Sequence, residues 1–191
     1  MKKSCVSLVV FLVGILATAV LYAAEFSADA VHKFEGAREK VTKMYMGKNK
    51  IRNEGMGEGN YMIVRMDLKK SWVVMPSKKA YMEMKANLQN IPQTEEKVKG
   101  EISRKLVGSE SVNGHPTKKY EVTYKDGTKT IRSYQWIATD LNFPIRMADA
   151  NGKWVTEYRN IKTGSQPDSL FEIPAGYKKL SIPGMSGMKM K

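Results

Sequence analysis

The sequence predicts a mainly β protein (α+β) of one domain, built from antiparallel strands and one short helix. Large apolar and polar residues alternate at a period of two, as in Tyr120 to Tyr124, which is the pattern of a half-buried strand. Asp126-Gly127 stands between two such runs, and glycine takes the positive φ that a tight hairpin turn requires. The sequence has no βαβ spacing, which excludes a doubly wound sheet and its usual nucleotide site.

The strands are expected as two successive meanders, because the stretches between them are two to six residues long, as antiparallel neighbours need. The N-terminal strands are expected near Ser27–Phe34, Arg38–Met46, Lys50–Asn53, Tyr61–Asp67, Ser71–Met75 and Ala80–Lys85. The C-terminal strands are expected at Tyr120–Tyr124, Thr128–Ile137, Ile145–Ala148 and Trp154–Ile161, with turns at Asn113-Gly114, Asp126-Gly127 and Asn151-Gly152.

One segment departs from the strand pattern. Its apolar residues Leu88, Ile91, Val98 and Ile102 are spaced like the buried stripe of a helix. Asn90 can cap such a helix, and proline is tolerated in the first turn that follows. We therefore expect a single helix over residues 90–103.

The N-terminus has the composition of a secretory signal peptide. Lys2 and Lys3 precede a run that is almost entirely apolar from Val6 to Leu21. We expect residues 1–24 to be removed by cleavage near Ala24, and the protein to be periplasmic. Cys5 lies before the apolar run, so we expect no lipid anchor. The folded domain is expected over residues 25–181, followed by a disordered Met-rich tail over 182–191.

Residues suited to catalysis are few. The chain has one Cys, in the signal region, and two histidines, so three clustered histidines for a catalytic zinc are impossible. It has neither a Gly-x-Ser-x-Gly elbow nor a phosphate-binding Gly-x-x-x-x-Gly-Lys motif. A Ser-His-Asp triad stays open, because its members need not be neighbours in sequence. We expect no enzyme, no catalytic residue, no metal and no cofactor.

Methionine is the unusual residue, with 13 in the chain. Pairs of methionines fall two or four residues apart in predicted strands, so each pair is expected to point to one side of the sheet. Flexible thioether side chains suit a surface that accepts an apolar ligand of varied shape. Two alternatives stay open. The methionines could be ordinary core residues, or they could bind Cu(I), together with Met185, Met188 and Met190 of the tail.

The net charge of +13 raises the question of an anionic partner. Lysines occur as scattered pairs, such as Lys69-Lys70 and Lys118-Lys119, without interleaved aromatics or a nucleic-acid-binding motif. Export also separates the protein from nucleic acid, so we expect no nucleic acid partner. An anionic membrane surface or an acidic protein is the better candidate. Simple solvation of sheet edges by lysine stays an equal alternative.

A series of short stretches, running from about Phe26 to Leu180, resembles a known family in its order and spacing. The stretches are Ile51 to Glu54, Ile63 to Asp67 with Trp72, Pro76 and Tyr81, Leu106 to Gly114, Trp136-Ile137, Phe143 to Arg146, Asn151 to Lys153, Glu157 to Ile161, and Leu170 to Tyr177. They resemble the LolA/LolB-like superfamily of outer-membrane lipoprotein-sorting proteins, in an uncharacterised exported branch.

This resemblance implies a strongly curved antiparallel half-barrel sheet of about 10–11 strands, with the short helix as a lid over an apolar cavity for acyl chains. The predicted function is a periplasmic carrier or binding protein for a lipid or lipoprotein acyl chains, expected to be a monomer. The alternative is a non-catalytic basic module that docks an anionic membrane or an acidic protein. The expected ligand-lining residues are Met44, Met46, Met62, Val64, Met66, Met75, Met82, Met84, Tyr134 and Trp136.

Overall fold

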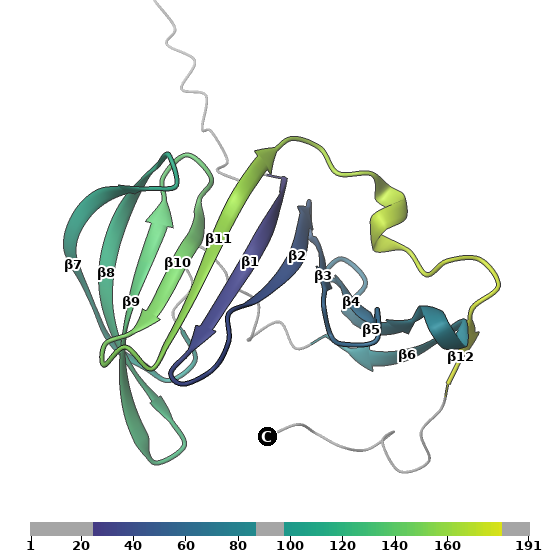
Figure 1. Cartoon of the computed structure of the whole chain (residues 1–191), viewed down its shortest axis with the longest axis horizontal. Helices are drawn as coiled ribbons and strands as arrows, with labels where there is room; N and C mark the ends of the chain where they lie inside the picture. The colour runs from purple at the N-terminus through teal and green to yellow at the C-terminus, as the bar shows by residue number, and fades with distance from the viewer. Residues whose placement is uncertain (1–24, 87–97, 181–191) are drawn as a thin grey trace, which may run out of the picture.

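The computed structural model describes residues 25–86 and 98–180, which form a single open sheet (Figure 1). The strands are β1 (Phe26–Phe34), β2 (Lys40–Gly47), β3 (Lys50–Glu54), β4 (Tyr61–Arg65), β5 (Lys70–Met75), β6 (Ala80–Lys85), β7 (Glu101–Val112), β8 (His115–Asp126), β9 (Lys129–Ala138), β10 (Phe143–Asp149), β11 (Trp154–Thr163) and β12 (Lys178–Lys179). Two short 3-10 turns, η1 (Pro76–Lys78) and η3 (Asp168–Phe171), complete the described structure. The mainly β class predicted from the sequence is confirmed.

The sheet consists of two antiparallel meanders joined side by side. In space the order is β12-β6-β5-β4-β3-β2-β1-β11-β10-β9-β8-β7, so β1 to β6 form one meander and β7 to β11 the other. They meet where β1 pairs antiparallel with β11, from Phe26 opposite Thr163 to Phe34 opposite Trp154. A bulge between Ser27 and Asp29 interrupts this register. The N-terminal strand therefore lies in the middle of the sheet.

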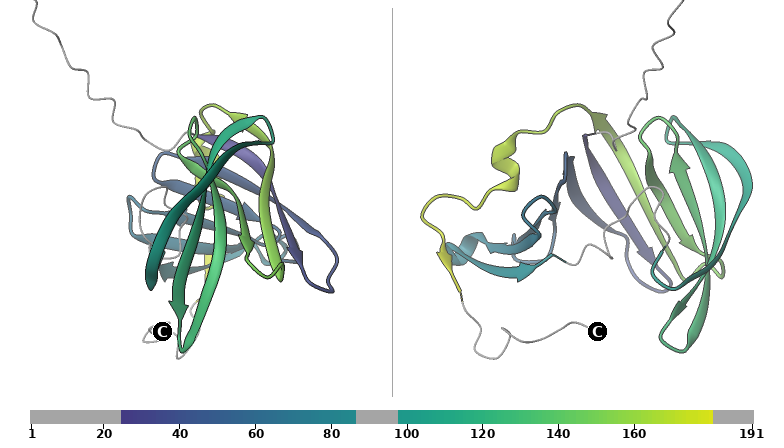
Figure 2. Two further views of the ribbon diagram at one scale, coloured as in Figure 1. Left: turned by 90° about the vertical axis from the view of Figure 1, so that its left-hand side faces the viewer. Right: turned by 180° about the vertical axis from the view of Figure 1, so that it is seen from behind.

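The sheet is highly curved, and Figure 2 shows the bend from two sides. Strands β6 and β7 lie ten places apart in the spatial order, so in a flat sheet they would be about 48 Å apart at ~4.8 Å per strand. The sixteen residues from Lys85, the end of β6, to Glu101, the start of β7, span at most about 58 Å when fully extended, so the length of this link does not by itself impose the bend.

The tight turns form where the sequence predicts them. Asn113 and Gly114 both have positive φ, 52° and 85°, as the turn between β7 and β8 requires. Gly127 and Gly152, which follow β8 and β10, have φ of 60° and 79°. The Gly152 amide also donates a hydrogen bond of 3.1 Å to the Asp149 carbonyl, which closes the turn between β10 and β11.

The larger hydrophobic core spans the junction of the two meanders. The Phe26 ring of β1 and the Phe143 ring of β10 have centroids 5.1 Å apart, although β11 lies between their strands. Phe143 also packs edge-on against Tyr158 of β11 at 5.2 Å. The cluster includes Ala28, Ala30, Met44, Met46, Ile51, Val64, Ala86, Val112, Trp136, Ala138, Leu141, Ile145 and Ala148. The three aromatic rings thus bridge three neighbouring strands.

A second, smaller core lies on the opposite face of β3 to β5, beneath the C-terminal segment. Phe171 of η3 is buried there with Tyr61, Ile63, Trp72 and Val74. The segment ends in β12, which pairs parallel with β6 and is the exception to the otherwise antiparallel order. The strand pattern of the sequence does not predict this covering segment.

The predicted helix over residues 90–103 is wrong in its described part. Residues 87–97 lie outside the described residues, but Glu101 already begins β7, which pairs with β8 along its length. Gly100 has a φ of 75°, and its carbonyl accepts a hydrogen bond of 2.9 Å from the Lys125 amide. Pairing with β8 therefore overrides the local helical spacing of Val98 and Ile102. This added strand and β12 raise the strand number to twelve.

The predicted signal peptide, residues 1–24, lies outside the described residues, and so does the predicted tail over 182–191. No helix in residues 25–86 or 98–180 has the length and apolar character needed to cross a membrane.

We predict that Phe143→Ala lowers the free energy of unfolding by about 3–5 kcal/mol, because it leaves a cavity between Phe26 and Tyr158. Phe34→Ala is the matched control, since Phe34 is 57% exposed, and it should change stability by less than about 0.5 kcal/mol. Urea unfolding followed by circular dichroism measures both. Equal losses for the two variants would contradict the assigned core.

Candidate functional site

Seven of the ten expected lining residues lie on one face of strands β2 to β6, which we call the methionine face. The strand registers show this directly. Met44 on β2 lies opposite Asn53, Asn53 lies opposite Met62 on β4, Met62 lies opposite Val73, and Val73 lies opposite Met82 on β6. Residues two apart in a strand share a face. The face therefore carries Met44, Met46, Met62, Val64, Met75, Met82 and Met84.

The methionine face changes from buried to partly exposed across the sheet. Met44 and Met46 of β2 are buried in the larger core. Val64 and Met75 are also buried, but Met62, Met82 and Met84 are partly exposed. Met66 follows β4 and packs against the larger core. The methionine face is thus buried in the core near the junction of the meanders, and toward β6 it becomes an accessible apolar surface.

Tyr134 and Trp136 lie in the second meander, on one face of β9. Trp136 is a buried member of the larger core, and Tyr134 packs against that core. Their rings meet edge-on, with centroids 6.1 Å apart. The structure therefore brings both aromatics into the core that also contains Met44 and Met46. The partly exposed Met82 and Met84 are at the far end of the other meander, on β6.

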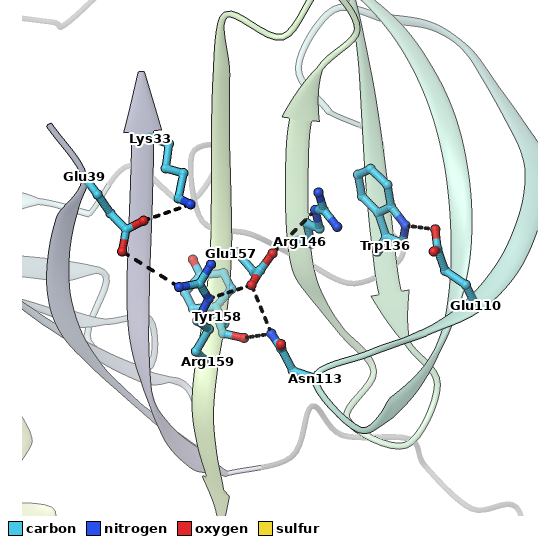
Figure 3. Close-up of polar contacts among 9 residues, drawn as sticks. All are labelled: Lys33, Glu39, Glu110, Asn113, Trp136, Arg146, Glu157, Tyr158 and Arg159. Carbon is cyan, nitrogen blue, oxygen red and sulfur yellow. Dashed lines mark hydrogen bonds and ion pairs between the residues drawn. The ribbon is translucent and has the colours of Figure 1, made fainter. Parts of the chain in front are cut away.

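Trp136 is held by charged groups as well as by apolar neighbours. Its indole Nε1 donates a hydrogen bond to Glu110 of β7 (Figure 3). The Lys119 ammonium lies 4.7 Å and the Arg146 guanidinium 4.8 Å from the ring centroid, within the range of cation–π attraction. The Tyr134 ring also contacts Lys119, at 4.8 Å. This part of the sheet is a polar and aromatic cluster, which the local sequence pattern does not predict.

Glu157 of β11 connects that cluster to the tip of the β7–β8 hairpin (Figure 3). Its carboxylate accepts hydrogen bonds from Arg159 Nε at 2.7 Å and Asn113 Nδ2 at 3.4 Å, and lies 3.6 Å from Arg146 Nε. Burial opposes ionisation, but the hydrogen bonds from Arg159 and Asn113 outweigh it, so the pKa of Glu157 is lowered. Asn113 Nδ2 also donates to the Tyr158 carbonyl at 2.9 Å. These contacts fix the hairpin against β11.

The two histidines occupy different surroundings. His32 lies on the β1 continuation of the methionine face, with Nδ1 3.1 Å from Thr156 Oγ1 and Nε2 3.5 Å from Thr42 Oγ1. Burial, with a further contribution from Lys40, lowers the pKa of His32. His115 is the first residue of β8, and its Nδ1 lies 2.7 Å from Asp140 Oδ2. Within residues 25–86 and 98–180 no three His, Cys, Asp or Glu side chains gather closely enough to hold a metal ion.

Two hollows open on the surface of the described structure. One, of about 450 Å³, is lined by Ser109, Glu110, Ser111, Gly114, Pro116 and Thr117 at the β7–β8 hairpin. The other, of about 310 Å³, is lined by Leu68, Lys69, Lys70, Glu83, Met84 and Lys85 beside β6. Met84, one of the expected lining residues, borders this second hollow. The tail methionines Met185, Met188 and Met190 lie outside the described residues, so the Cu(I) alternative stays a prediction.

Glu83, beside the second hollow, ties the C-terminal strand to the sheet. It accepts hydrogen bonds from Lys179 Nζ of β12 at 2.8 Å, from Trp72 Nε1 at 3.0 Å and from Lys70 Nζ at 3.3 Å. These donors, Lys179 first and Trp72 next, lower the pKa of Glu83 to about 2 from its ordinary value of 4.5. The carboxylate is therefore a structural anchor for β12.

Together these features define a class of protein: a single, open, highly curved β-sheet with one apolar, methionine-rich face. The family model of a domain of unknown function, DUF4412, matches residues 32–142 and 138–177. These two segments cover well over half of the chain, which therefore belongs to this family. No curated protein matches the sequence.

Several solved structures resemble the chain, among them those of the following two proteins. An uncharacterised conserved protein from Thermus thermophilus is 13% identical, with a TM-score of 0.56, over 83% of this chain and 90% of that one. A LolA superfamily protein from Nitrosomonas europaea is 14% identical, with a TM-score of 0.37, over 80% of this chain and 91% of that one. A LolA superfamily protein is thus among the similar structures. At 13% identity, the likeness to the Thermus thermophilus protein concerns the fold alone.

We predict that Glu83→Gln destabilises the protein at neutral pH and that its effect fades in acid. Because the folded pKa is below the unfolded one, the stabilisation by Glu83 is fully present above about pH 4.5 and is lost as the pH falls toward 2. Urea unfolding from pH 7 to pH 3 measures the difference from the native protein. Glu58→Gln, in an exposed loop, is the control; a Glu83→Gln difference that stays constant with pH would contradict the anchor role.

Proposed function

We propose that the methionine face binds an apolar ligand, such as a lipid or the acyl chains of a lipoprotein, in the bacterial periplasm. The observation that carries this proposal is the row of methionines on adjacent strands, which is buried at β2 and partly exposed at β6. On the opposite face, the C-terminal segment covers the apolar residues of β3 to β5. Of the two faces of these strands, the methionine face is therefore the one with accessible apolar surface.

The side-chain chemistry of this face supports a flexible ligand. Methionine is unbranched, with several rotatable bonds and a polarisable sulfur, so it adapts to the shape of its partner. Met62, Met82 and Met84 supply such side chains on strands whose backbones are held in one sheet. A rigid backbone with adaptable side chains suits an acyl chain, which has no fixed shape of its own.

The energetics of transfer are compatible with a carrier. Moving about 15 methylenes out of water stabilises a complex by roughly 12 kcal/mol, at about 0.8 kcal/mol for each methylene. Insertion into a bilayer gives a similar gain in free energy, so a lipid can move between the bilayer and the protein with a small net change. A face that is only partly exposed at β6 is suited to such exchange.

A non-catalytic role agrees with the surroundings of the two histidines. His32 is placed between two threonines, and His115 contacts Asp140, so both side chains have structural partners.

Export to the periplasm is supported by the signal-like composition of residues 1–24.

A second candidate function is docking to an anionic membrane or an acidic protein. It is favoured by pairs of exposed lysines on separate turns and strands, among them Lys78-Lys79 and Lys178-Lys179. A lysine close to an anionic bilayer surface contributes about 1 kcal/mol to the free energy of membrane binding. The two functions separate in one purification: co-purifying lipid supports the carrier, whereas a lipid-free extract with salt-sensitive membrane association supports docking.

We predict that Met82→Asp weakens binding of a fluorescent fatty acid by roughly tenfold or more, because a carboxylate on the methionine face has to be desolvated by the ligand. Met84→Asp should act in the same way. Met56→Asp is the matched control, since Met56 is exposed in the loop between β3 and β4, and it should bind like the native protein. Fluorescence titration measures all three variants.

Mass spectrometry of the organic extract of the purified protein provides an independent readout. Native protein and Met56→Asp should carry lipid, and Met82→Asp should carry less. Unchanged binding and unchanged lipid content in both methionine-face variants would show that the ligand does not lie on this face.

A further inference from the structure

Within residues 25–86 and 98–180, strand β7 forms an edge of the sheet. It is twelve residues long, is last in the spatial order and has β8 as its paired strand among those residues. The opposite edge is different, because it consists of the two-residue β12, held beside β6. An edge strand presents a row of unpaired N–H and C=O groups that can pair with another strand. In Figure 1, β7 is the strand at the left-hand end of the sheet.

The same strand carries apolar side chains in contact with solvent. Ile102 is 57% exposed, Leu106 52% and Val107 44%, and they account for three of the eight large apolar residues that are exposed in the described structure. Ile102 and Val107 are the extra residues of two bulges, at Glu101/Ser103 and Leu106/Gly108. Between Ile102 and Val112, an outer strand edge and exposed apolar side chains thus coincide in the described structure, which is the combination used when strands are added to a sheet edge.

We propose that β7 pairs antiparallel with β7 of a second copy of this chain, about a two-fold axis beside Val107 and Gly108. In this register Leu106 lies opposite Ser109 of the second copy, and Lys105 lies opposite Glu110 of the second copy. Symmetry repeats both pairs. The dimer replaces the monomer expected from the sequence.

The register is supported by which residues share a face. Lys105 lies opposite Glu121 on β8, and Glu121 lies opposite Tyr134 on β9. In the same way, Glu110 lies opposite Thr117, and Thr117 lies opposite Ala138 on β9. Because Tyr134 and Ala138 are four residues apart in one strand, they share a face, and so do Lys105 and Glu110; the bulge at Val107 accounts for their odd spacing. Opposite charges directly across two strands stabilise the pairing. The Glu110 carboxylate, already bonded to Trp136, has further lone pairs to accept from a lysine.

The bulge itself favours a second copy over an unrelated strand. A bulge inserts one residue, so a regular partner strand would fall out of step with β7 at Val107. When two copies of β7 pair, Val107 of each copy lies opposite Gly108 of the other. Both strands then contain the extra residue, so the register is the same on either side of the bulge. A side chain placed at Gly108 would meet no atom within 4 Å, which leaves space for Val107 of the second copy.

Charge reversal tests the proposed register. Sedimentation velocity over a concentration series should show dimers of the native protein, and Lys105→Glu should raise the dimer dissociation constant about tenfold by facing Glu110 of the second copy. The double variant Lys105→Glu/Glu110→Lys should restore the dimer. Lys118→Glu makes the same change in net charge on β8, away from the free edge, and should leave the dimer unchanged. A native protein that stays monomeric at every concentration would overturn the proposal.

Disulfide trapping tests it independently. The described residues contain no cysteine, so Leu106→Cys/Ser109→Cys should form a covalent dimer on oxidation, seen on a non-reducing gel. Leu106→Cys/Ser111→Cys shifts the second cysteine by two residues and should cross-link far less. Equal cross-linking of the two double variants would overturn the register. Neither experiment depends on lipid binding, so its failure leaves the proposed function standing.

Discussion

The pairing of β1 with β11 is the interaction on which the rest of the structure depends. Without it the chain would form two separate meanders, connected by the link between β6 and β7 and by the C-terminal segment that runs from β11 to β12. With it, residues near both ends of the described chain form the centre of one sheet, and the Phe26, Phe143 and Tyr158 rings meet across three strands.

The two meanders of the bent sheet differ in chemistry. In the first, methionines continue from the core of β2 to the partly exposed surface of β6, while the C-terminal segment covers the opposite face of β3 to β5. In the second, charged groups around Trp136 and Glu157 hold β7 to β11 together. In the proposed function, the adaptable methionines bind the lipid while the second meander keeps the sheet in shape. The outer edge of β7, as the described residues show it, is a further surface beside the methionine face.

The candidate site was partly predictable from the sequence. The methionine pairs could be assigned to one face because strands β2 to β6 are regular, and side-chain direction then follows from counting residues. The charged groups around Trp136 could not be predicted, because Glu110, Lys119 and Arg146 come from three different strands. Their meeting depends on registers that contain bulges, as between β9 and β10. A bulge adds one residue and shifts the alternation, and nothing in the local sequence marks its position.

By itself the sequence determined the mainly β class, most of the strands and the turns at Asn-Gly and Asp-Gly, because these depend on alternation and on the φ preferences of a few residues. Tertiary structure decided what local preference could not. Residues around Val98 to Ile102 have helical spacing, yet Glu101 begins a strand because β8 supplies a partner ladder. The covering of the second core by Phe171 was likewise decided by packing between residues about a hundred positions apart. Such contacts have no signature in any short stretch of the chain.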